Sequence, residues 1–350
     1  MSLVKKMRNV SRDRLRHRDT HLLGDSAAAV TALGFGAAAL GNLFTAVTER
    51  DAAAALEQAW SDGIRYFDTA PYYGYGTSEQ RLGSILAEKP RDAFCLSTKV
   101  GRLLRKDADW PSASEFHGQH ALGAVCDYGY DATWQSLDES LERLTLKRID
   151  VALLHDLDPT VHEAEAFERH VRVALNGACR ALEEMRRSGV VSAIGLGIND
   201  AYTAERFVRE MPLDVVLLAG RYTLLEHASA CSLLAECERR GISVVIGGPF
   251  NSGVLADDPH LHYDYAPAPA SIRTRVAKLR AVCARHRVSL GAASLQFPLG
   301  QPAVAAVIPG MRDAGQVRQN VEWLETSIPR VMWEDLRKEG LLFEDVPTPV

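Results

Sequence analysis

Short apolar runs of the kind that form buried β-strands recur along the chain, and longer segments with helical spacing separate them. Two of these segments predict amphipathic helices, with one apolar face formed by Ala52, Leu56, Ala59 and Trp60 and the other by Leu137, Leu141 and Leu144. Asp131 and Thr133 are candidate N-cap residues of the second helix. We expect strands at about residues 31–36, 64–69, 94–99, 150–155, 192–197, 214–219, 242–247 and 304–308.

Strands that alternate with helices predict an all-parallel sheet, and eight strands are the number that closes into a (β/α)8 barrel, the TIM barrel. No Pro- or Ser-rich linker interrupts the alternation, so we expect one α/β domain over residues 30–350. A doubly wound open sheet is the alternative, and its dinucleotide-binding form carries GxGxxG after the first strand. The chain has GFGAAALG at 34–41, whose third glycine is misplaced. This disfavours the open sheet.

Two long segments interrupt the alternation, at about residues 101–130 and 249–269. Both contain several aromatic residues and histidines, and loops of this length in a compact domain are usually lids or disordered. We expect them to cover a ligand at the C-terminal face of the barrel. Residues 1–29 are rich in charge near their start and lack the apolar core of a signal peptide, so we expect a flexible N-terminal arm.

Composition narrows the classes of partner. With 47% hydrophobic and 24% charged residues, the 350-residue chain has the composition of a soluble globular protein. Its net charge of −5 has no polybasic run, which disfavours nucleic acid and anionic membranes as partners. No segment approaches the roughly 20 apolar residues of a membrane span, and the six cysteines lack CxxC spacing. We therefore expect a cytoplasmic protein with reduced thiols; oligomeric state has no signature here.

Four residues whose side chains can take part in catalysis lie at the ends of predicted strands: Asp68 and Tyr73 in DTAPYYGYG, Lys99 in STKV and His155 in VALLHD. The C-terminal strand ends of a parallel barrel meet at one face, where enzymes of this fold keep their chemistry. Taken singly, each residue also fits a structural role. Tyr73 alone is typical of a surface aromatic, Lys99 of a solvated charge at a strand end, and His155 of a structural pair with Asp156. Their joint position favours one functional cluster.

A metal site is the alternative for the segment HDLDPTVH at 155–162. Metal sites on barrels draw their ligands from several strands. The other strand ends here supply Lys99, Asn199 and glycines, which are not metal ligands of that kind. We therefore expect no metal.

The cluster and its spacing resemble the catalytic tetrad of the aldo-keto reductases, and the similarity runs from about residue 30 to 324. Within that family the chain is most similar to bacterial sugar and pyridoxal dehydrogenases. The resemblance implies a (β/α)8 barrel and a nicotinamide cofactor, NAD or NADP, extended across the strand ends. Its supporting segments are STKVGR (97–102), CDYGYD (126–131), RIDVALLHD (148–156), IGLGIND (194–200), GGPFNSGVL (247–255) and VIPGMRDAGQVRQN (307–320).

Exchange of hydride between a substrate and nicotinamide requires a proton donor or acceptor at the substrate oxygen. Tyrosine has a pKa near ~10, and we expect the Lys99 ammonium to bring the pKa of Tyr73 toward neutrality. Asp68 would keep the buried Lys99 charged, and His155 would donate a hydrogen bond to the reacting oxygen. Tyr73 is then the general acid in reduction and, as phenolate, the general base in oxidation.

The resemblance also implies cofactor contacts. Asn199 would meet the nicotinamide amide, the segment PFNSG (249–253) the pyrophosphate, and Asn320 the adenine. The full expected set is Gly36, Ala37, Ala38, Asp68, Asn199, Arg221, Gly248, Pro249, Phe250, Asn251, Ser252, Gly253, Ile308, Gly310, Arg312, Gln316, Gln319 and Asn320.

Several positions depart from the family pattern. Gly247 replaces a tyrosine that stacks on the nicotinamide in many members, and Ala219 replaces a glutamine, so Phe250 or Arg221 are candidates to hold the ring. Many NADPH-dependent members have basic side chains that bind the 2′-phosphate at the adenine ribose, and this chain lacks them. Because charge-assisted bonds dominate phosphate recognition, their absence favours NAD over NADP. The positions concerned are Gly310, Met311 and Gln316, with Arg312 and Arg318 nearby as partial compensation.

For function, the resemblance implies oxidation of a small cyclic hemiacetal to its lactone, the substrate being an aldose such as L-fucose or a D-threo-aldose, or pyridoxal. We expect Trp110, Tyr128, His155, Arg221 and Tyr263 to line the substrate pocket. Two other functions stay open: an NADPH-dependent aldehyde or ketone reductase, and a non-enzymatic, cofactor-sensing regulatory subunit. The intact tetrad argues against the second.

Overall fold

Eight parallel strands form the central sheet of the structure, a computed structural model that describes residues 16–106, 115–118, 121–256 and 262–349. The last strand returns to the first, because the Gly34 amide donates to the Val307 carbonyl and the Val307 amide to the Ala32 carbonyl, each at 2.9 Å. The sheet closes into the predicted barrel, and the doubly wound alternative is wrong. The strands lie on the eight predicted runs, with β5 and β9 each extending one residue past the predicted end. They are β3 (Phe35–Gly36), β4 (Tyr66–Asp68), β5 (Cys95–Val100), β8 (Val151–His155), β9 (Ala193–Ile198), β10 (Val215–Ala219), β11 (Ser243–Gly247) and β14 (Val304–Ile308).

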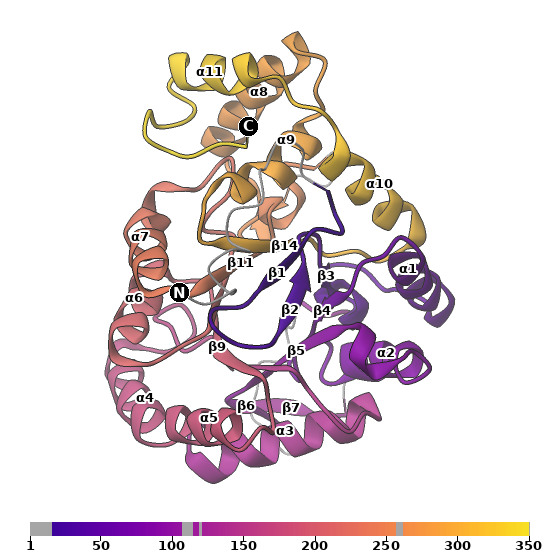
Figure 1. Cartoon of the computed structure of the whole chain (residues 1–350), viewed down its shortest axis with the longest axis vertical. Helices are drawn as coiled ribbons and strands as arrows, with labels where there is room; N and C mark the ends of the chain where they lie inside the picture. The colour runs from indigo at the N-terminus through magenta and orange to yellow at the C-terminus, as the bar shows by residue number, and fades with distance from the viewer. Residues whose placement is uncertain (1–15, 107–114, 119–120, 257–261, 350) are drawn as a thin grey trace, which may run out of the picture.

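Helices surround the barrel (Figure 1). The predicted apolar faces are confirmed, since Leu56 and Leu137 are each only 1% exposed. The predicted N-caps of α3 are wrong: the helix begins after Gly129, and the Thr133 hydroxyl donates to the Gly129 carbonyl at 2.8 Å from inside the first turn. The helices are α1 (Glu49–Ser61), α2 (Thr77–Leu86), α3 (Tyr130–Leu144), α4 (Ala164–Asn176), α5 (Ala178–Arg187), α6 (Ala201–Glu210), α7 (Cys231–Arg240), α8 (Ala270–Arg285), α9 (Leu290–Gln296), α10 (Ala314–Glu325) and α11 (Arg330–Lys338).

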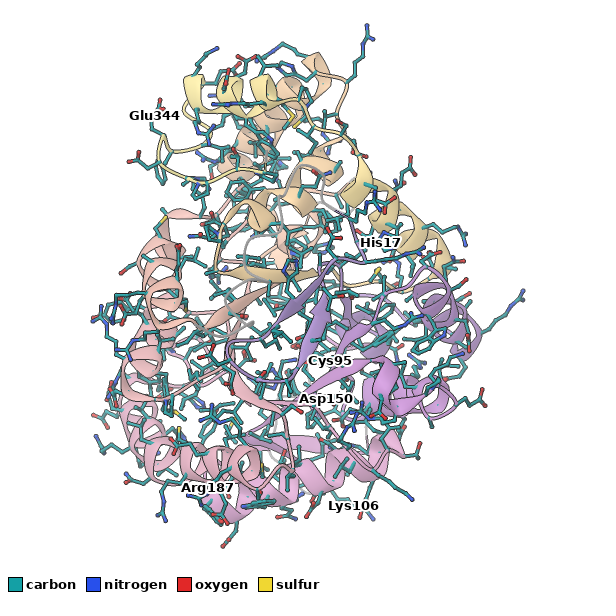
Figure 2. The ribbon with its side chains drawn as sticks, viewed as in Figure 1. His17, Cys95, Lys106, Asp150, Arg187 and Glu344 are labelled. Carbon is teal, nitrogen blue, oxygen red and sulfur yellow. The ribbon has the colours of Figure 1, made fainter. Side chains whose placement is uncertain are left out.

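The N-terminal segment is part of the fold from residue 16 onward. An antiparallel hairpin of β1 (Thr20–Leu22) and β2 (Ala29–Thr31) packs Leu23 and Val30 against side chains inside the barrel. His17 is buried, and its ring nitrogens lie 2.6 Å from Glu325 Oε1 and 2.6 Å from the Asp62 carbonyl (Figure 2). The flexible arm predicted for residues 1–29 is therefore wrong over 16–29, and residues 1–15 lie outside the described part.

The two long predicted loops contain short hairpins at the C-terminal face. The first loop holds β6 (Arg102–Arg105) paired with β7 (Gly123–Cys126), and the second holds β12 (His262–Tyr263) paired with β13 (Ala266–Pro267). Both hairpins are antiparallel additions to the parallel barrel. Within the described residues, each loop therefore carries a hairpin of its own.

All six cysteines lie in the described residues as free thiols, and four of them, Cys95, Cys179, Cys237 and Cys283, are buried. These four therefore belong to the core, as the apolar runs around them predict. Across the described ranges, helices long and apolar enough to cross a membrane are absent.

Candidate active site

A buried ion pair occupies the C-terminal end of the barrel interior. Lys99 Nζ lies 2.7 Å from Asp68 Oδ2, and the two side chains are 1% and 2% exposed. The Ser97 hydroxyl donates to the other Asp68 oxygen at 2.6 Å, and Lys99 Nζ also donates to the Thr69 carbonyl at 2.9 Å. Because residues i and i+2 of a strand share a face, Ser97 and Lys99 of β5 both reach Asp68 on β4. These hydrogen bonds offset the cost of burying two charges.

The segment after β4 carries Tyr73 over this ion pair. Gly74 has φ 61°, and a Cβ built on it would lie 2.4 Å from the Gly41 carbonyl oxygen, so only glycine permits this close approach of two backbones. The contact holds Tyr73 in place, with Lys99 Nζ 4.5 Å from the centroid of the tyrosine ring. The ring of His155, at the end of β8, lies 5.9 Å from that of Tyr73. The four residues predicted from strand ends therefore lie together.

Burial controls the ionisation of this cluster. It raises the pKa of Tyr73 well above its usual range, with the Asp68 and Asp156 carboxylates adding to the rise and Arg102 opposing it. The predicted shift of the Tyr73 pKa toward neutrality under Lys99 is therefore wrong for this structure, since burial dominates and the Lys99 charge is paired with Asp68. Burial, Arg102 and Lys99 together lower the pKa of His155 far below its usual value, so its imidazole is neutral at pH 7.

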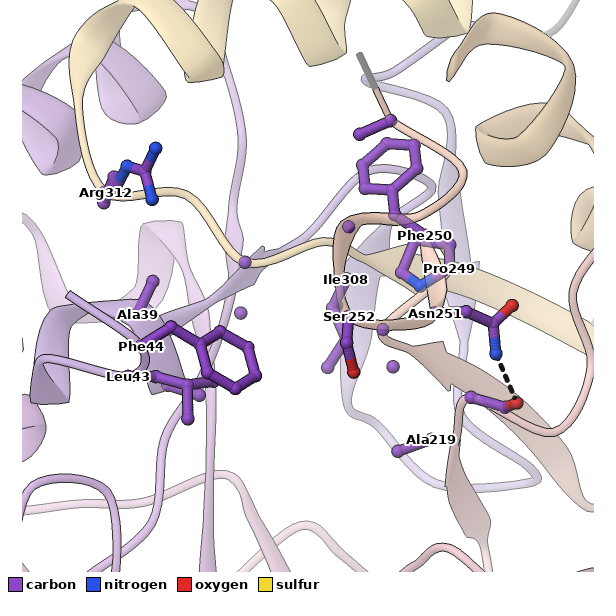
Figure 3. Close-up of a pocket in the computed structure, with 18 of the residues that line it drawn as sticks. Ala39, Leu43, Phe44, Ala219, Pro249, Phe250, Asn251, Ser252, Ile308 and Arg312 are labelled. Atoms are coloured by element: carbon purple, nitrogen blue, oxygen red, sulfur yellow. Dashed lines mark hydrogen bonds between the residues drawn. The ribbon is translucent and has the colours of Figure 1, made fainter. Parts of the chain in front are cut away.

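A cavity of about 630 Å³ runs from this cluster across the strand ends (Figure 3). Asp68, Tyr73 and Asn199 line it near the barrel axis, and Arg312, Gln316 and Asn320 line it at the start of α10. All the predicted cofactor residues line the cavity except Ala37. The side chain of Ala37 is fully buried, and its carbonyl accepts from the Ser78 hydroxyl at 2.7 Å.

The predicted substrate residues separate into different places. Arg221 lines the cavity and pairs with Asp264 at 3.0 Å, and Trp110 lies outside the described residues. The prediction for Tyr128 is wrong, because it is fully buried and its hydroxyl lies 2.8 Å from His162 Nε2. Neither Tyr263 nor His155 is among the cavity-lining residues. The Tyr263 hydroxyl donates to Glu226 Oε1 at 2.7 Å, whereas the His155 ring lies against Tyr73, which does line the cavity.

Two aromatic residues cover the cavity: Tyr265, in the second loop that we expect to form a lid, and Phe44, which the sequence does not indicate. Phe44, in the loop before α1, stacks on His262 with ring centroids 5.4 Å apart and lies 6.0 Å from the Tyr265 ring. Figure 3 shows Phe44 facing Ser252 and Phe250 across the cavity. The Tyr265 amide donates to the Ser252 hydroxyl at 3.1 Å, which fixes the lid loop to the segment below it. Apart from aromatic content, the sequence carries no periodic signal for such loop contacts.

The segment HDLDPTVH does not converge on a metal. Asp158 Oδ1 accepts from the Thr160 amide at 2.9 Å, while His162 contacts Tyr128 instead. In the part of the chain that the structure describes, no group of three or more His, Cys, Asp or Glu side chains is placed to hold a metal ion.

A family model and several relatives match nearly the whole chain. The model of the Aldo/keto reductase family matches residues 32–339, and the chain therefore belongs to this family of oxidoreductases, whose enzymes use NAD(P)(H). Pyridoxal 4-dehydrogenase of Microbacterium luteolum is 41% identical over 341 residues, which cover 94% of this chain and 99% of that protein. D-threo-aldose 1-dehydrogenase of a Pseudomonas species is 42% identical over 331 residues, covering 92% and 96%.

A solved structure agrees with the fold. The holo form of aldo-keto reductase AKR11C1 from Bacillus halodurans has a TM-score of 0.74 at 22% identity, and the match covers 94% of this chain and 99% of that one. At this identity the similarity supports the barrel architecture alone.

The cavity fits the nicotinamide dinucleotide of the family. Asn320 Oδ1 is buried at its far end with no hydrogen-bond partner among the described residues, while Nδ2 of the same amide donates to the Gln316 carbonyl at 2.9 Å. An unpartnered buried acceptor that lines a cavity is placed to receive a ligand donor. Asn251 and Ser252 have φ 46° and 60°, a loop conformation that can turn backbone amides toward an anion.

We expect Tyr73→Phe to keep the fold and the cofactor affinity while lowering turnover by roughly 10² or more, because only the proton-transferring oxygen is lost. Cofactor affinity is measured by quenching of tryptophan fluorescence, for which Trp323 lines the cavity. Tyr75→Phe, in the same segment, is the matched control and should turn over almost normally. Near-normal turnover of Tyr73→Phe would remove this residue from the mechanism.

The ion pair makes a separate prediction about stability. Lys99→Met leaves the Asp68 charge buried without its partner, and we expect the free energy of unfolding to fall by about 3 to 5 kcal/mol. The double variant Asp68→Asn with Lys99→Met should recover most of that loss, because no buried charge remains. Denaturant unfolding of the three proteins measures this. A single variant as stable as the double would contradict the buried-pair account.

Proposed function

We propose that the protein is an NAD(P)-dependent dehydrogenase that oxidises a small cyclic hemiacetal, an aldose or pyridoxal, to its lactone. The observation that carries this proposal is that the cavity ends on Tyr73, with the Asp68–Lys99 pair and His155 against the same residue. Two relatives at 41% and 42% identity are named for dehydrogenation of pyridoxal and of an aldose. Both compounds exist largely as cyclic hemiacetals, which supports a shared substrate form.

Each residue of the cluster has a defined part in this reaction. Tyr73, as phenolate, removes the proton from the hydroxyl on the carbon that loses hydride. Neutral His155 donates a hydrogen bond to the same oxygen and orients it, and the Asp68–Lys99 pair fixes the position of the phenol. The oxidised cofactor, when bound, supplies the hydride acceptor. Loss of one proton and one hydride converts the hemiacetal carbon into a lactone carbonyl, with no need for water.

The raised pKa of Tyr73 sets the direction of the pH dependence. The phenolate is the reactive form in oxidation, so oxidation gains from rising pH, whereas reduction uses the neutral phenol and loses activity as the phenol ionises. Arg102 is the cation that acts against the rise in the Tyr73 pKa.

Substrate contacts belong to the same end of the cavity. We assign Arg221 and His155 to the substrate, with Trp110 from the first lid as a further candidate. Tyr265 lines the cavity and takes the place that the sequence analysis gave to Tyr263. Arg221 is anchored by Asp264 and offers a planar donor to ring oxygens.

We propose NAD as the preferred cofactor. The ribose end of the cavity is lined by Gly310, Arg312, Asp313 and Gln316, which places a carboxylate next to its cation. The Asp313 carboxylate caps α10 by accepting from the Gln316 amide at 2.9 Å. A 2′-phosphate at this end would meet one cation and one anion, which weakens the case for NADP.

Arg312 supports the second candidate, an NADPH-dependent aldehyde or ketone reductase. Its guanidinium lines the same end of the cavity and is able to take a 2′-phosphate. The preferred cofactor and direction of turnover separate the two functions.

Gly310→Lys should improve NADP binding by roughly tenfold or more, since a charge-assisted phosphate contact is worth about 1.5 to 3 kcal/mol. A Cβ at this position lies at ordinary distance from its nearest neighbour, Ala39 Cβ at 3.7 Å, so the backbone leaves room for a side chain to begin here. Gly310→Met is the uncharged control of similar length, and NAD affinity should change little in either variant. If the unmodified protein already binds NADP much more tightly than NAD, the preference proposed here is wrong.

The substrate form makes a further prediction. An analogue of L-fucose whose ring-forming hydroxyls are methylated cannot cyclise, and we expect its oxidation to be much slower than that of L-fucose. The reason is that a free aldehyde offers Tyr73 no hydroxyl proton. Lactone should appear before any carboxylic acid when the products are followed by NMR. Equal oxidation rates, or acid without prior lactone, would favour the reductase.

A further inference from the structure

Two charged residues outside the predicted tetrad lie against it. Arg102 begins β6, and Asp156 directly follows His155 at the end of β8. Arg102 Nη2 lies 3.0 Å from Asp156 Oδ2, with the side chains 4% and 18% exposed. The Arg102 guanidinium carbon also lies 4.3 Å from the centroid of the Tyr72 ring. A second ion pair is thus buried beside the tetrad. Removing its two charges from water costs free energy, and two apolar side chains could pack there without that cost.

The backbone brings the Asp156 carboxylate to the ring of its own neighbour. In a regular strand, the side chains of consecutive residues point to opposite faces. Asp156 instead has φ 39°, a left-handed conformation that its amide secures by donating to the Gly197 carbonyl at 2.8 Å. Asp156 Oδ2 then lies 3.3 Å from His155 Nε2. One carboxylate oxygen therefore contacts both Arg102 and His155.

This contact decides which nitrogen of His155 carries the proton. A neutral imidazole has one donor and one acceptor nitrogen. Nδ1 of His155 is buried without a hydrogen-bond partner among the described residues, whereas Nε2 faces a carboxylate, which can only accept. The proton is therefore favoured on Nε2. At 3.3 Å the approach to Asp156 is longer than a usual hydrogen bond, so this N–H is the one ring donor that His155 offers to the substrate oxygen. A lone pair on Nε2 would be repelled by Asp156.

The pair lies one ring away from Tyr73, because Asp156 Oδ2 is 3.3 Å from His155 Nε2 and the His155 ring centroid is 5.9 Å from that of Tyr73. Its two charges act on the phenol with opposite signs. The Asp156 charge raises the pKa of the phenol, and the Arg102 charge lowers it. The other ionisable groups near the phenol come from the barrel strands and the lid: Tyr66, Asp68, Lys99, His155 and Tyr265.

We propose that Arg102 and Asp156 are a positioning pair for proton transfer: Asp156 holds the ring proton of His155 on Nε2, and Arg102 balances the Asp156 charge at the Tyr73 phenol. The roles of His155 and Tyr73 rest on the proposed function. The contacts of the pair do not.

The pair predicts opposite pH shifts for its two neutral variants. Asp156→Asn leaves the Arg102 charge unopposed, so the Tyr73 phenolate forms more easily and the rising limb of the oxidation profile moves to lower pH. Arg102→Met leaves the Asp156 charge unopposed and moves the limb to higher pH. Each shift should be roughly one pH unit, and the double variant should return close to the unmodified profile.

A matched control lies at the other end of the same strand. Asp150 precedes β8, and its Oδ2 lies 2.6 Å from Arg91 Nη2, so Asp150→Asn also removes one partner of a buried ion pair (Figure 2). Like Asp156→Asn, this variant should lose stability because one charge of an ion pair is removed, but Asp150 is remote from Tyr73. Its pH profile should not move.

A second measurement needs no turnover. The ¹⁵N shifts of a neutral histidine reveal which ring nitrogen is protonated, and His155 is assigned by its absence from the spectrum of His155→Gln. We expect the Nε2–H form alone in the unmodified protein and in Asp150→Asn, and a mixture of both forms in Asp156→Asn, because an amide can face the ring with either its oxygen or its nitrogen.

The outcomes separate this inference from the proposed function. If the enzyme proves to be a reductase, the same variants are compared on the falling limb of reduction, which reports the same phenol. The proposed role of the pair would be wrong if the pH limbs of Asp156→Asn and Arg102→Met moved in the same direction or did not move. It would also be wrong if the His155 spectrum were unchanged in Asp156→Asn. If Arg102→Met does not fold, the two results for Asp156→Asn decide.

Discussion

The ion pair between Asp68 and Lys99 is the constraint on which the rest of the site depends. Two charges that are almost fully removed from water persist only when each is matched by the other and by further polar groups. Ser97 and the Thr69 carbonyl supply those groups, and Gly197 leaves room, since a Cβ there would lie 3.0 Å from Lys99 Cε. The pair therefore fixes the ends of β4 and β5 relative to each other. Tyr73 is held over this fixed point rather than on a mobile surface.

The cavity lies between the strand ends of the barrel and the aromatic side chains of two loops that cover them. Strand ends rich in small residues, such as Gly247 and Ala219, leave the floor open, while Phe44 and Tyr265 approach from opposite sides above it. The residues around Tyr73 are thus held by the barrel, and the cover over the cavity comes from two separate loops.

The sequence predicts the repeating parts of the molecule, the alternating strands and helices. It does not predict the hairpin at 20–31 or the contacts made by loop residues. The eight strands and the residues at their ends follow from apolar runs, because burial between helices and barrel interior requires such runs. The hairpin at 20–31 has a signal in the sequence, two short apolar stretches around Gly24 and Asp25, but the charged residues that precede it favour a flexible arm. Tyr128 and Tyr263 were assigned to the substrate by their loops, yet only the fold shows that their hydroxyls are engaged elsewhere. The contact between Asp156 and His155 depends on a left-handed residue that periodicity does not reveal.

A turnover screen with both cofactors tests the central claim most directly. L-Fucose, L-galactose, D-arabinose, pyridoxal and simple aldehydes are each supplied in the oxidising direction with NAD⁺ or NADP⁺ and in the reducing direction with NADH or NADPH. The account predicts oxidation of at least one compound that forms a cyclic hemiacetal, with NAD⁺ as the better acceptor and with the lactone as first product. Turnover confined to the reduction of simple aldehydes by NADPH would contradict it.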